Sequence, residues 1–301
     1  MNGQGKLLTH FLKNADKLVI PVYQRNYDWK EEHCKKLYSD LVKTVREGKR
    51  WHFFGGIVSV SDPMGSSSDY LVIDGQQRIT TVSLLLLAIA NLVKAGIATP
   101  KDPNLYDVIT KKYLVDEINP KQRKMKLKPI KGDQDSYDRL WGEPSEYNQS
   151  SRITQNYLYF YNQIQQDDIS VDQLFSAVEK LQIIDITLTP PDDDPQLVFE
   201  SLNSTGLDLN EGDKIRNFVL MRRSMEEQEQ FYDDYWSPIE KNAGYDKQTN
   251  SYDVSPFIRD YLGIKERRLT AMKEIYQEFK DYVEKRGQIE DVLKELRDYA
   301  K

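Results

Sequence analysis

The chain has 301 residues and a formal net charge of −6, with 39% hydrophobic and 30% charged residues. This length suffices for one large domain or two ordinary domains with a sizeable core. The negative charge argues against a protein that coats nucleic acid without selectivity, because such binding needs a wide basic surface. Binding of nucleic acid through a local basic patch is still compatible with this charge.

Cysteine and histidine usage excludes further classes of site. The single cysteine, Cys34, allows no internal disulfide, and His10, His33 and His52 lack the spacing of metal ligands, so we expect no zinc or histidine-metal nuclease centre. The longest apolar run, residues 82–93, is too short for a membrane span of roughly 20 residues. The N-terminus lacks the features of a secretion signal. We therefore expect a cytoplasmic protein without a membrane partner.

The first third of the chain predicts mixed helices and strands. Residues 17–23 are typical of a short strand that Pro21 ends or places at an edge. Residues 28–48 have the apolar spacing of a helix. Residues 52–61 and 69–74 predict two strands of a hairpin, and a helix runs from about Gln77 to Lys94.

The remainder is mostly helical. Residues 99–180 predict helices with one extended exception, and residues 182–189 predict a strand that rejoins the first sheet. The helical pattern of residues 270–301 continues to the end, which favours a missing downstream domain and a simple terminal helix about equally. We expect an α+β fold with a small mixed sheet, flanking helices, a mainly helical insertion and a helical C-terminal region. Its predicted regions are residues 1–98, 99–180, 181–221 and 222–301.

The segment "VIDGQQRITT" joins a strand to a helix. The strand ends at Asp74, Gly75 permits a tight reversal, and the helix begins at Gln76 or Gln77. A helix start offers unpaired N–H groups and about half a positive charge, to which Arg78 adds a forked donor for phosphate. Asp74 is suited to hold Mg²⁺ beside such phosphates. The alternative is that Asp74 only caps the helix and Arg78 pairs with a surface acid.

A second joint, "VFESLNSTGLDLNEGDKIRNFVLM", has a similar character. Asn210 and Asp213 stand in capping-box relation, which explains both without any function. A polar cluster that could grip a sugar or a metal precedes them: Glu200, Asn203, Ser204 and Thr205, around Gly206. The alternative is an ordinary loop between helices.

Two further segments suggest nucleic-acid contacts. In "IPVYQRNYDWK", Tyr23 and Tyr27 interleave with Gln24 and Arg25, which suits stacking on a base and clamping a phosphate, or alternatively the edge of a core. In "RKMKLKPI" alternate positions are lysines, so their cations are expected on one strand face. That face is a candidate DNA track, or a solvated edge strand. Its lysines are Lys124, Lys126 and Lys128.

Four segments together resemble a known family. "IPVYQRNYDW", "FFGGIV", "VIDGQQRITTVSLL" and "FESLNSTGLDLNEGDKIRNFVL" are similar, in that order, to the signature segments of the N-terminal domain family of GmrSD-type restriction endonucleases, whose fold resembles ParB and sulfiredoxin. The resemblance implies a module that binds and hydrolyses nucleoside triphosphates in bacterial defence against modified phage DNA. Relatives often carry a C-terminal histidine nuclease domain, but this chain has no histidine after His52, which implies a partner or further domain for cleavage.

The resemblance and the residue patterns give a set of candidate residues. The expected catalytic residues are Asp74, Gln77, Arg78 and Glu200, with Gln77 orienting the attacking water and Asp74 binding the metal. The expected nucleotide-binding residues are Gly75, Gln76, Thr80, Asn203, Thr205, Gly206, Asp213 and Asn217. The expected DNA-binding residues are Tyr23, Gln24, Arg25, Tyr27, Lys124, Lys126 and Lys128.

The functional hypothesis is a Mg²⁺-dependent NTPase module of a modification-dependent restriction system, with phosphoryl transfer achieved by positioning and charge. Its expected partners are modified DNA and a nuclease domain or subunit, and the base of the nucleotide and the oligomeric state stay open. The alternative is a nucleic-acid-binding or regulatory subunit without its own catalysis.

Overall fold

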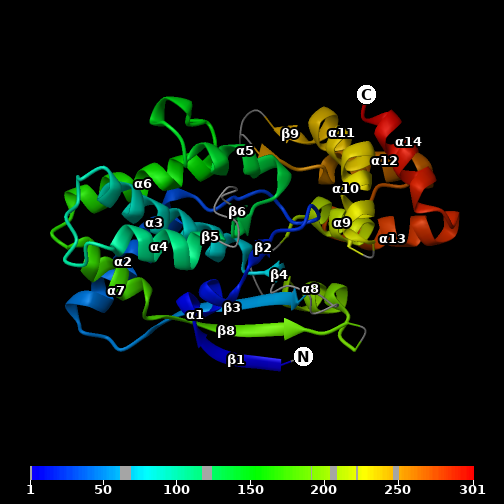
Figure 1. The fold of residues 1–301 in the computed structure, drawn as a ribbon. Helices are drawn as coiled ribbons and strands as arrows, with labels where there is room; N and C mark the ends of the chain where they lie inside the picture. Colours follow the sequence, from blue (N-terminus) through cyan, green and yellow to red (C-terminus); the bar gives the residue numbers. More distant parts are fainter. Residues whose placement is uncertain are drawn as a thin grey trace. The chain divides into compact units, whose positions relative to one another are not determined.

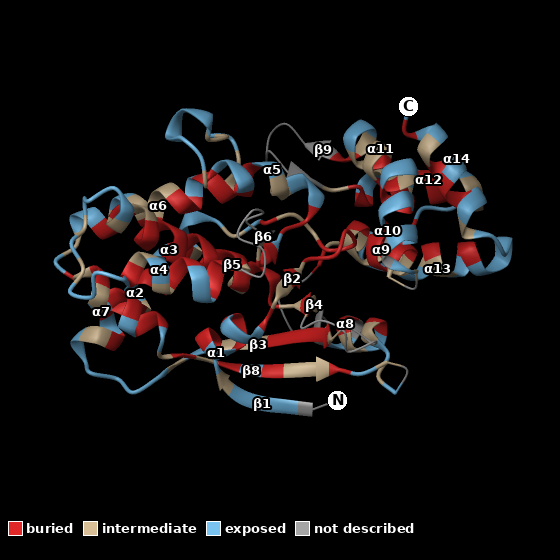
Figure 2. Ribbon diagram, in the orientation of Figure 1, coloured by how far each residue is buried: buried red, intermediate tan, exposed pale blue. Residues whose placement is uncertain are grey.

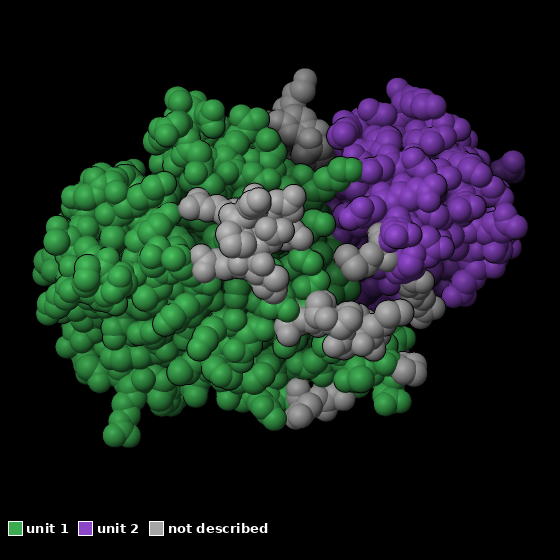
Figure 3. Space-filling model, in the orientation of Figure 1, with its two compact units in different colours: residues 1–21, 26–195 green, residues 22–25, 196–301 purple. Residues whose placement is uncertain are grey.

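The chain forms two compact units. The computed structural model describes residues 2–61, 69–116, 124–190, 192–203, 209–221, 223–246 and 251–301. Unit 1 comprises residues 1–21 and 26–195, and unit 2 comprises residues 22–25 and 196–301 (Figure 3). A four-residue segment from the N-terminal part, Val22–Arg25, therefore belongs to the C-terminal unit. The four regions predicted from the sequence do not coincide with these units, and that finer division stays a prediction.

Unit 1 is built on a six-stranded mixed sheet in the order β1-β8-β3-β4-β2-β7 (Figure 1). Its strands are β1 (Asn2–Leu7), β2 (Lys17–Val19), β3 (His52–Ser61), β4 (Asp69–Asp74), β7 (Leu127–Lys128) and β8 (Leu181–Leu188). β1 is antiparallel to β8 and β4 is antiparallel to β3, whereas the other neighbouring pairs are parallel. The predicted β3–β4 hairpin and the return of β8 to the sheet are confirmed, and so is the α+β class. The likeness to ParB stays a prediction.

The other elements of unit 1 are mostly helical, as expected for the insertion. They are α1 (Leu8–Asn14), α2 (Glu31–Arg46), α3 (Gln76–Lys94), α4 (Leu105–Ile109), the π-helix η1 (Thr110–Leu114), β5 (Val115–Asp116), β6 (Lys124–Met125), α5 (Lys131–Arg139), the 3-10 turn η2 (Pro144–Glu146), α6 (Arg152–Gln166) and α7 (Val171–Val178). β5 and β6 pair with each other in a separate two-stranded sheet.

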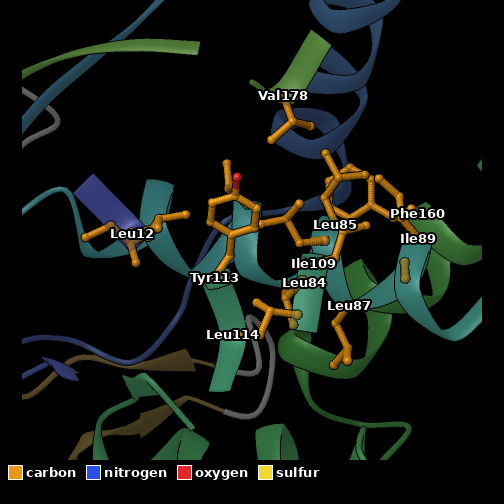
Figure 4. Packing of buried hydrophobic residues seen from close by; sticks show 14 of the residues in the cluster. Leu12, Leu84, Leu85, Leu87, Ile89, Ile109, Tyr113, Leu114, Phe160 and Val178 are labelled. Carbon is orange, nitrogen blue, oxygen red and sulfur yellow. The ribbon is translucent and has the colours of Figure 1, made fainter. Parts of the chain in front are cut away.

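Helix α3 forms the centre of the unit 1 core. Leu84, Leu85 and Leu87 are fully buried although they point to different sides of the helix, as is typical of a helix enclosed by its own domain (Figure 2). Figure 4 shows residues of other elements around them, among them Leu12 of α1 and Phe160 of α6. By length and hydropathy, α3 is long and apolar enough to cross a membrane. The expectation that residues 82–93 are too short for a membrane span is therefore corrected. The helix is mostly buried within its own domain, as a core helix is.

Strand β3 has an irregularity that matters for the site. Its pairing with β8 shifts register between Phe53 and Gly55, as in a β-bulge. Gly55 adopts φ of +120°, a conformation that L side chains rarely take. The bulge therefore places a glycine, in a conformation that other residues would adopt only with strain, in the middle of the sheet.

Unit 2 is helical apart from one short hairpin. Its elements are α8 (Pro195–Asn203, from Gln196 on), α9 (Glu211–Leu220), α10 (Met225–Phe231), the π-helices η3 (Tyr232–Trp236) and η4 (Glu240–Gly244), α11 (Ser237–Ile239), β9 (Tyr245–Asp246), β10 (Ser251–Tyr252), α12 (Ser255–Glu266), the 3-10 turn η5 (Met272–Glu274), α13 (Ile275–Arg286) and α14 (Ile289–Tyr299). The continuous pattern of residues 270–301 is broken in the structure, because Gly287 ends α13 at φ of +81°.

Candidate functional site

The guanidinium of Arg78 is held at the joint between β4 and α3. Its Nη1 donates a hydrogen bond to the carbonyl oxygen of Gly56, at 2.7 Å. The same nitrogen lies 3.5 Å from Oδ2 of Asp74, the last residue of β4, and both side chains stay partly exposed. The segments "FFGGIV" and "VIDGQQR", which are separate in sequence, therefore meet at this arginine.

Two glycines make room for Arg78. A Cβ added at Gly55 would stand 2.8 Å from Nε of Arg78, closer than real Cβ atoms approach other heavy atoms. A Cβ added at Gly75, whose φ is +93°, would stand 3.1 Å from the carbonyl oxygen of Gly56 and 3.3 Å from Nη1 of Arg78. Glycine is required at both positions by conformation and by space. The role of Gly55 and Gly56 was not predicted, although a repeated glycine inside a strand is a signal of close backbone approach.

Helix α3 begins without a side-chain cap. Its N-cap is Gly75 in the left-handed conformation, and no side-chain hydrogen bond caps this end. Asp74 therefore does not cap the helix, whereas the other half of that alternative, the pairing of Arg78 with an acid, agrees with its ion pair to Asp74. The first turn of a 19-residue helix with its positive dipole end lies beside the guanidinium of Arg78.

Gln77 is engaged with the backbone of the preceding loop. Its Oε1 accepts hydrogen bonds from the N–H groups of Asp28, at 2.9 Å, and Trp29, at 3.1 Å, and its Nε2 donates to the carbonyl oxygen of Asn26. The side chain is buried, so its observed role is to fix this loop on α3. An additional role in orienting water stays a prediction.

The remaining residues expected at this joint are buried. Gln76 and Thr80 are 8% and 2% exposed, which places them inside unit 1 rather than at its surface. No group of three or more His, Cys, Asp or Glu side chains that could hold a metal occurs within the part of the chain that the structure describes. Asp74 is thus a single accessible carboxylate, and such a residue fits Mg²⁺ only when phosphate oxygens and water complete its coordination.

In unit 2, Arg216 of α9 clamps the segment Val22–Arg25. Its Nε and Nη2 donate to the carbonyl oxygen of Val22 at 2.9 and 2.6 Å, and its Nη1 donates to Oε1 of Glu240 at 2.9 Å. The guanidinium also lies 5.0 Å from the centre of the Tyr232 ring. Arg216 was not among the predicted site residues, because a charged residue on a helix gives no sign of burial.

Asp213 lies near the same clamp. Its backbone N–H donates to Oδ1 of Asn210 at 2.7 Å, so Asn210 is the N-cap of α9, but the reciprocal bond of the predicted capping box, from the Asp213 side chain to the Asn210 backbone, does not form. Burial raises the pKa of the Asp213 carboxyl to about 6, while the positive charges of Arg216 and Arg25 oppose this shift. A carboxyl with this pKa changes charge close to neutral pH.

Asn217 follows Asp213 one turn later on α9. It is 4% exposed, and within the described ranges its Oδ1 has no hydrogen-bond partner. A buried amide oxygen without a partner is costly, which makes Asn217 a notable residue of unit 2.

The two expected stacking tyrosines are buried. Tyr23 is 1% exposed and packs edge-on against Phe199, with ring centres 6.5 Å apart. Tyr27 is 6% exposed, its hydroxyl lies 2.7 Å from Oγ1 of Thr81, and it accepts a hydrogen bond from Nδ2 of Asn156. The expectation that these rings offer faces to a base is corrected, because packing and hydrogen bonds occupy them. Gln24 is likewise buried, and Arg25 is only partly buried.

The predicted lysine face does not form. The chain bends at Lys126, so that β6 and β7 belong to different sheets. Nζ of Lys126 is buried and donates to the carbonyl oxygens of Leu12, Lys13 and Lys112 at 3.0 to 3.2 Å. Lys128 is exposed, and the side chain of Lys124 lies outside the described residues. Lys126 therefore cannot contact DNA together with Lys128.

The sequence model of the family described as GmrSD restriction endonuclease, N-terminal domain, matches residues 8–220. The chain belongs to this GmrSD family. No curated protein matches it. Membership makes the protein a component of a restriction and phage-defence system, with DNA and a nuclease as the partners that the family suggests.

The GmrSD signature residues fall into two groups. Gly75 and Arg78 meet the glycines of β3 in unit 1. In unit 2, Val22 and Arg25 lie near Arg216 and Asp213 of α9, and Tyr23 packs against Phe199 of α8. Four of the predicted site residues cannot be placed fully. Thr205 and Gly206 lie outside the described residues, and so do the side chains of Glu200 and Asn203.

Proposed function

We propose that this GmrSD-family protein binds and hydrolyses a nucleoside triphosphate, with the phosphates bound at the start of α3 beside Arg78. The observation that carries the proposal is the position of the Arg78 guanidinium, which Gly56 and Asp74 hold next to an uncapped helix N-terminus. Together these groups supply forked donors and a positive dipole end, which is the chemistry that recognises phosphate.

The geometry suits phosphoryl transfer by positioning. The bond to the Gly56 carbonyl uses one of the five N–H donors of Arg78 and fixes the plane of its guanidinium. A fixed guanidinium needs little rearrangement to stabilise charge on a transferring phosphoryl group. Asp74 supports this arrangement, since its carboxylate lies beside the same nitrogen.

Mg²⁺ bound with the nucleotide would supply charge neutralisation on the phosphate oxygens. Asp74 is the residue of this joint that would hold it, with the remaining ligands coming from phosphate and water. Asp74 would then have two roles, as the ion-pair partner of Arg78 and as a metal ligand.

Release of inorganic phosphate tests the proposal. Each of the four triphosphates is incubated with Mg²⁺ and the protein, with and without modified DNA. We expect turnover of at least one triphosphate, a loss of at least tenfold in Arg78→Ala, and a comparable loss in Asp74→Asn. Turnover that survives both substitutions would place the reaction elsewhere and reject the proposed site.

The alternative function is a nucleic-acid-binding module without catalysis, and two of the residues expected to contact DNA are not accessible. Lys126 is bonded to three carbonyl groups and Tyr27 is enclosed in the core. Strong, salt-dependent DNA binding that is indifferent to nucleotide would still favour it.

A further inference from the structure

Unit 1 contains a pocket that the phosphate site does not use. Its volume is about 340 Å³, and it lies between the C-terminal end of α3, the turn after α5, and α6. From Arg78 to Lys94, which lines the pocket, the helix rises by about 24 Å. The pocket is therefore separate from the proposed phosphate site, and its volume is close to the smallest ligand pockets of roughly 300 Å³.

The walls of this pocket are aromatic. Trp141, Tyr147, Tyr157 and Tyr161 all line it. The rings of Tyr147 and Tyr157 pack edge-on with centres 5.7 Å apart, and those of Tyr157 and Tyr161 are tilted by 37° at 5.9 Å. Because the three tyrosine rings pack against one another, this part of the wall is formed before any ligand arrives.

One amide on α3 is fixed in orientation at this wall. Nδ2 of Asn91 donates to the hydroxyl of Tyr157 at 2.9 Å and to the carbonyl oxygen of Leu140 at 3.5 Å. The Leu140 carbonyl can only accept, so the amide nitrogen faces that side. The acceptor Oδ1 of Asn91 is then the atom left for a ligand, which selects ligands that carry an N–H donor.

The lining of the pocket does not select a cation by charge. Lys94 and Glu143 both line it and are exposed, so the lining carries one charge of each sign. A quaternary ammonium can lie against aromatic ring faces, but it carries no N–H donor for Oδ1 of Asn91.

We propose that this pocket binds a nucleobase, as a free nucleoside or as an unstacked base of a single strand. A base offers a flat ring for the aromatic wall and an N–H donor for Oδ1 of Asn91, which is the exocyclic amino group in adenine, cytosine and guanine and N3–H in thymine. The assignment does not depend on triphosphate binding at α3.

Saturation-transfer NMR with nucleosides, which carry no phosphate, tests the proposal. Adenosine, cytidine, guanosine and thymidine are each titrated into the wild-type chain, with N3-methylthymidine as a nucleoside whose base has no N–H donor and choline as the cationic competitor. We expect binding of the four nucleosides in preference to N3-methylthymidine, no displacement by choline, and unchanged binding in Arg78→Ala. Preference for choline, or no nucleoside binding by the folded protein, overturns the assignment.

Variants of the wall locate the binding. Tyr161→Ala is expected to weaken nucleoside affinity at least fivefold, whereas Tyr161→Phe retains it because the ring face remains. Trp51→Ala serves as the control, since Trp51 is 56% exposed and does not line the pocket. If Tyr161→Ala fails to fold, Ala95→Phe blocks the pocket from an exposed position instead. Full affinity in the folded blocking variant overturns the assignment.

Oligonucleotides distinguish the two sources of the base. A short single strand that binds more tightly than its nucleosides, while the matching duplex does not, identifies the base of a strand as the occupant. Equal affinity for nucleoside and strand identifies a free nucleoside. Both results support the pocket as a nucleobase site.

Discussion

Arg78 of α3 lies directly against Gly55 of β3, so that a single methyl group at Gly55 would stand 2.8 Å from Nε of the arginine. This contact joins the bulge of one strand to the first turn of the central helix. It gives one reason for glycine at Gly55 of β3 and at Gly75 before α3: a side chain at either position would collide with atoms of Arg78 or its hydrogen-bond acceptor.

Gly55→Ala tests this contact. Alanine at φ of +120° is strained, at a cost of about 1–3 kcal/mol, and its methyl group displaces Arg78. We expect at least a tenfold loss of triphosphate affinity, measured by calorimetry. Gly5→Ala is the matched control, since a Cβ there meets nothing within 4 Å. Full affinity in a folded Gly55→Ala protein would show that the position of Arg78 is unimportant.

Gln77→Ala should act on stability. It leaves the partly buried N–H groups of Asp28 and Trp29, and the carbonyl oxygen of Asn26, without their partner, so the free energy of unfolding should fall by about 1–3 kcal/mol in urea denaturation. Gln165→Ala, an exposed amide on α6, should change it by less than about 0.5 kcal/mol. If Gln77 only oriented water, its variant would keep full stability and lose turnover.

The clamp of unit 2 gives a third prediction. Arg216→Ala leaves Glu240 mostly buried without its cation and releases Val22, so we expect about 3–5 kcal/mol of destabilisation and faster hydrogen exchange at Val22 to Arg25. Adding Glu240→Gln should recover part of this loss, with a coupling of at least about 1 kcal/mol. Arg259→Ala, which breaks an exposed pair with Asp260, is the control. Additive effects of the first two substitutions would contradict the clamp.

Asp213 should make stability depend on pH. Its pKa of about 6 exceeds the ordinary 3.8, so between these values the folded state holds more protons than the unfolded state. The free energy of unfolding should therefore fall as pH rises from about 4 to 6 and then level off, by at most about 3 kcal/mol. Urea denaturation of wild type and Asp213→Asn across pH 4–7.5 isolates this contribution. A stability difference between the two that does not vary with pH would refute the raised pKa.

The sequence predicted the elements whose residue pattern matches their environment. The residue patterns around α3, β3 and β4 indicated a long helix and a hairpin, and both are present. Strand β1 escaped prediction, because its sequence NGQGKL is polar and contains glycine, and its pairing with β8 stabilises it instead.

Predictions failed where tertiary contacts decide the environment of a polar residue. Alternation placed Lys126 on a solvated face, but the bend at this residue turns its ammonium toward three carbonyl groups of unit 1. Tyr27 looked suited to stacking and instead satisfies its hydroxyl within the core. Arg216 gave no local signal, since its acceptor at Val22 is 194 positions away. Such partners are set by the fold and cannot be read from neighbouring residues.

Calorimetric titration of each triphosphate with Mg²⁺ into wild-type protein, Arg78→Ala and Arg78→Lys tests the central claim most directly. Binding of at least one triphosphate to the wild type, its loss in Arg78→Ala and a weakened affinity in Arg78→Lys, with all three proteins equally folded, is the predicted result, because lysine keeps the charge and lacks the fork. Undiminished affinity in Arg78→Ala, or no binding of any triphosphate to the wild type, would contradict the assignment of the α3 joint as a phosphate site.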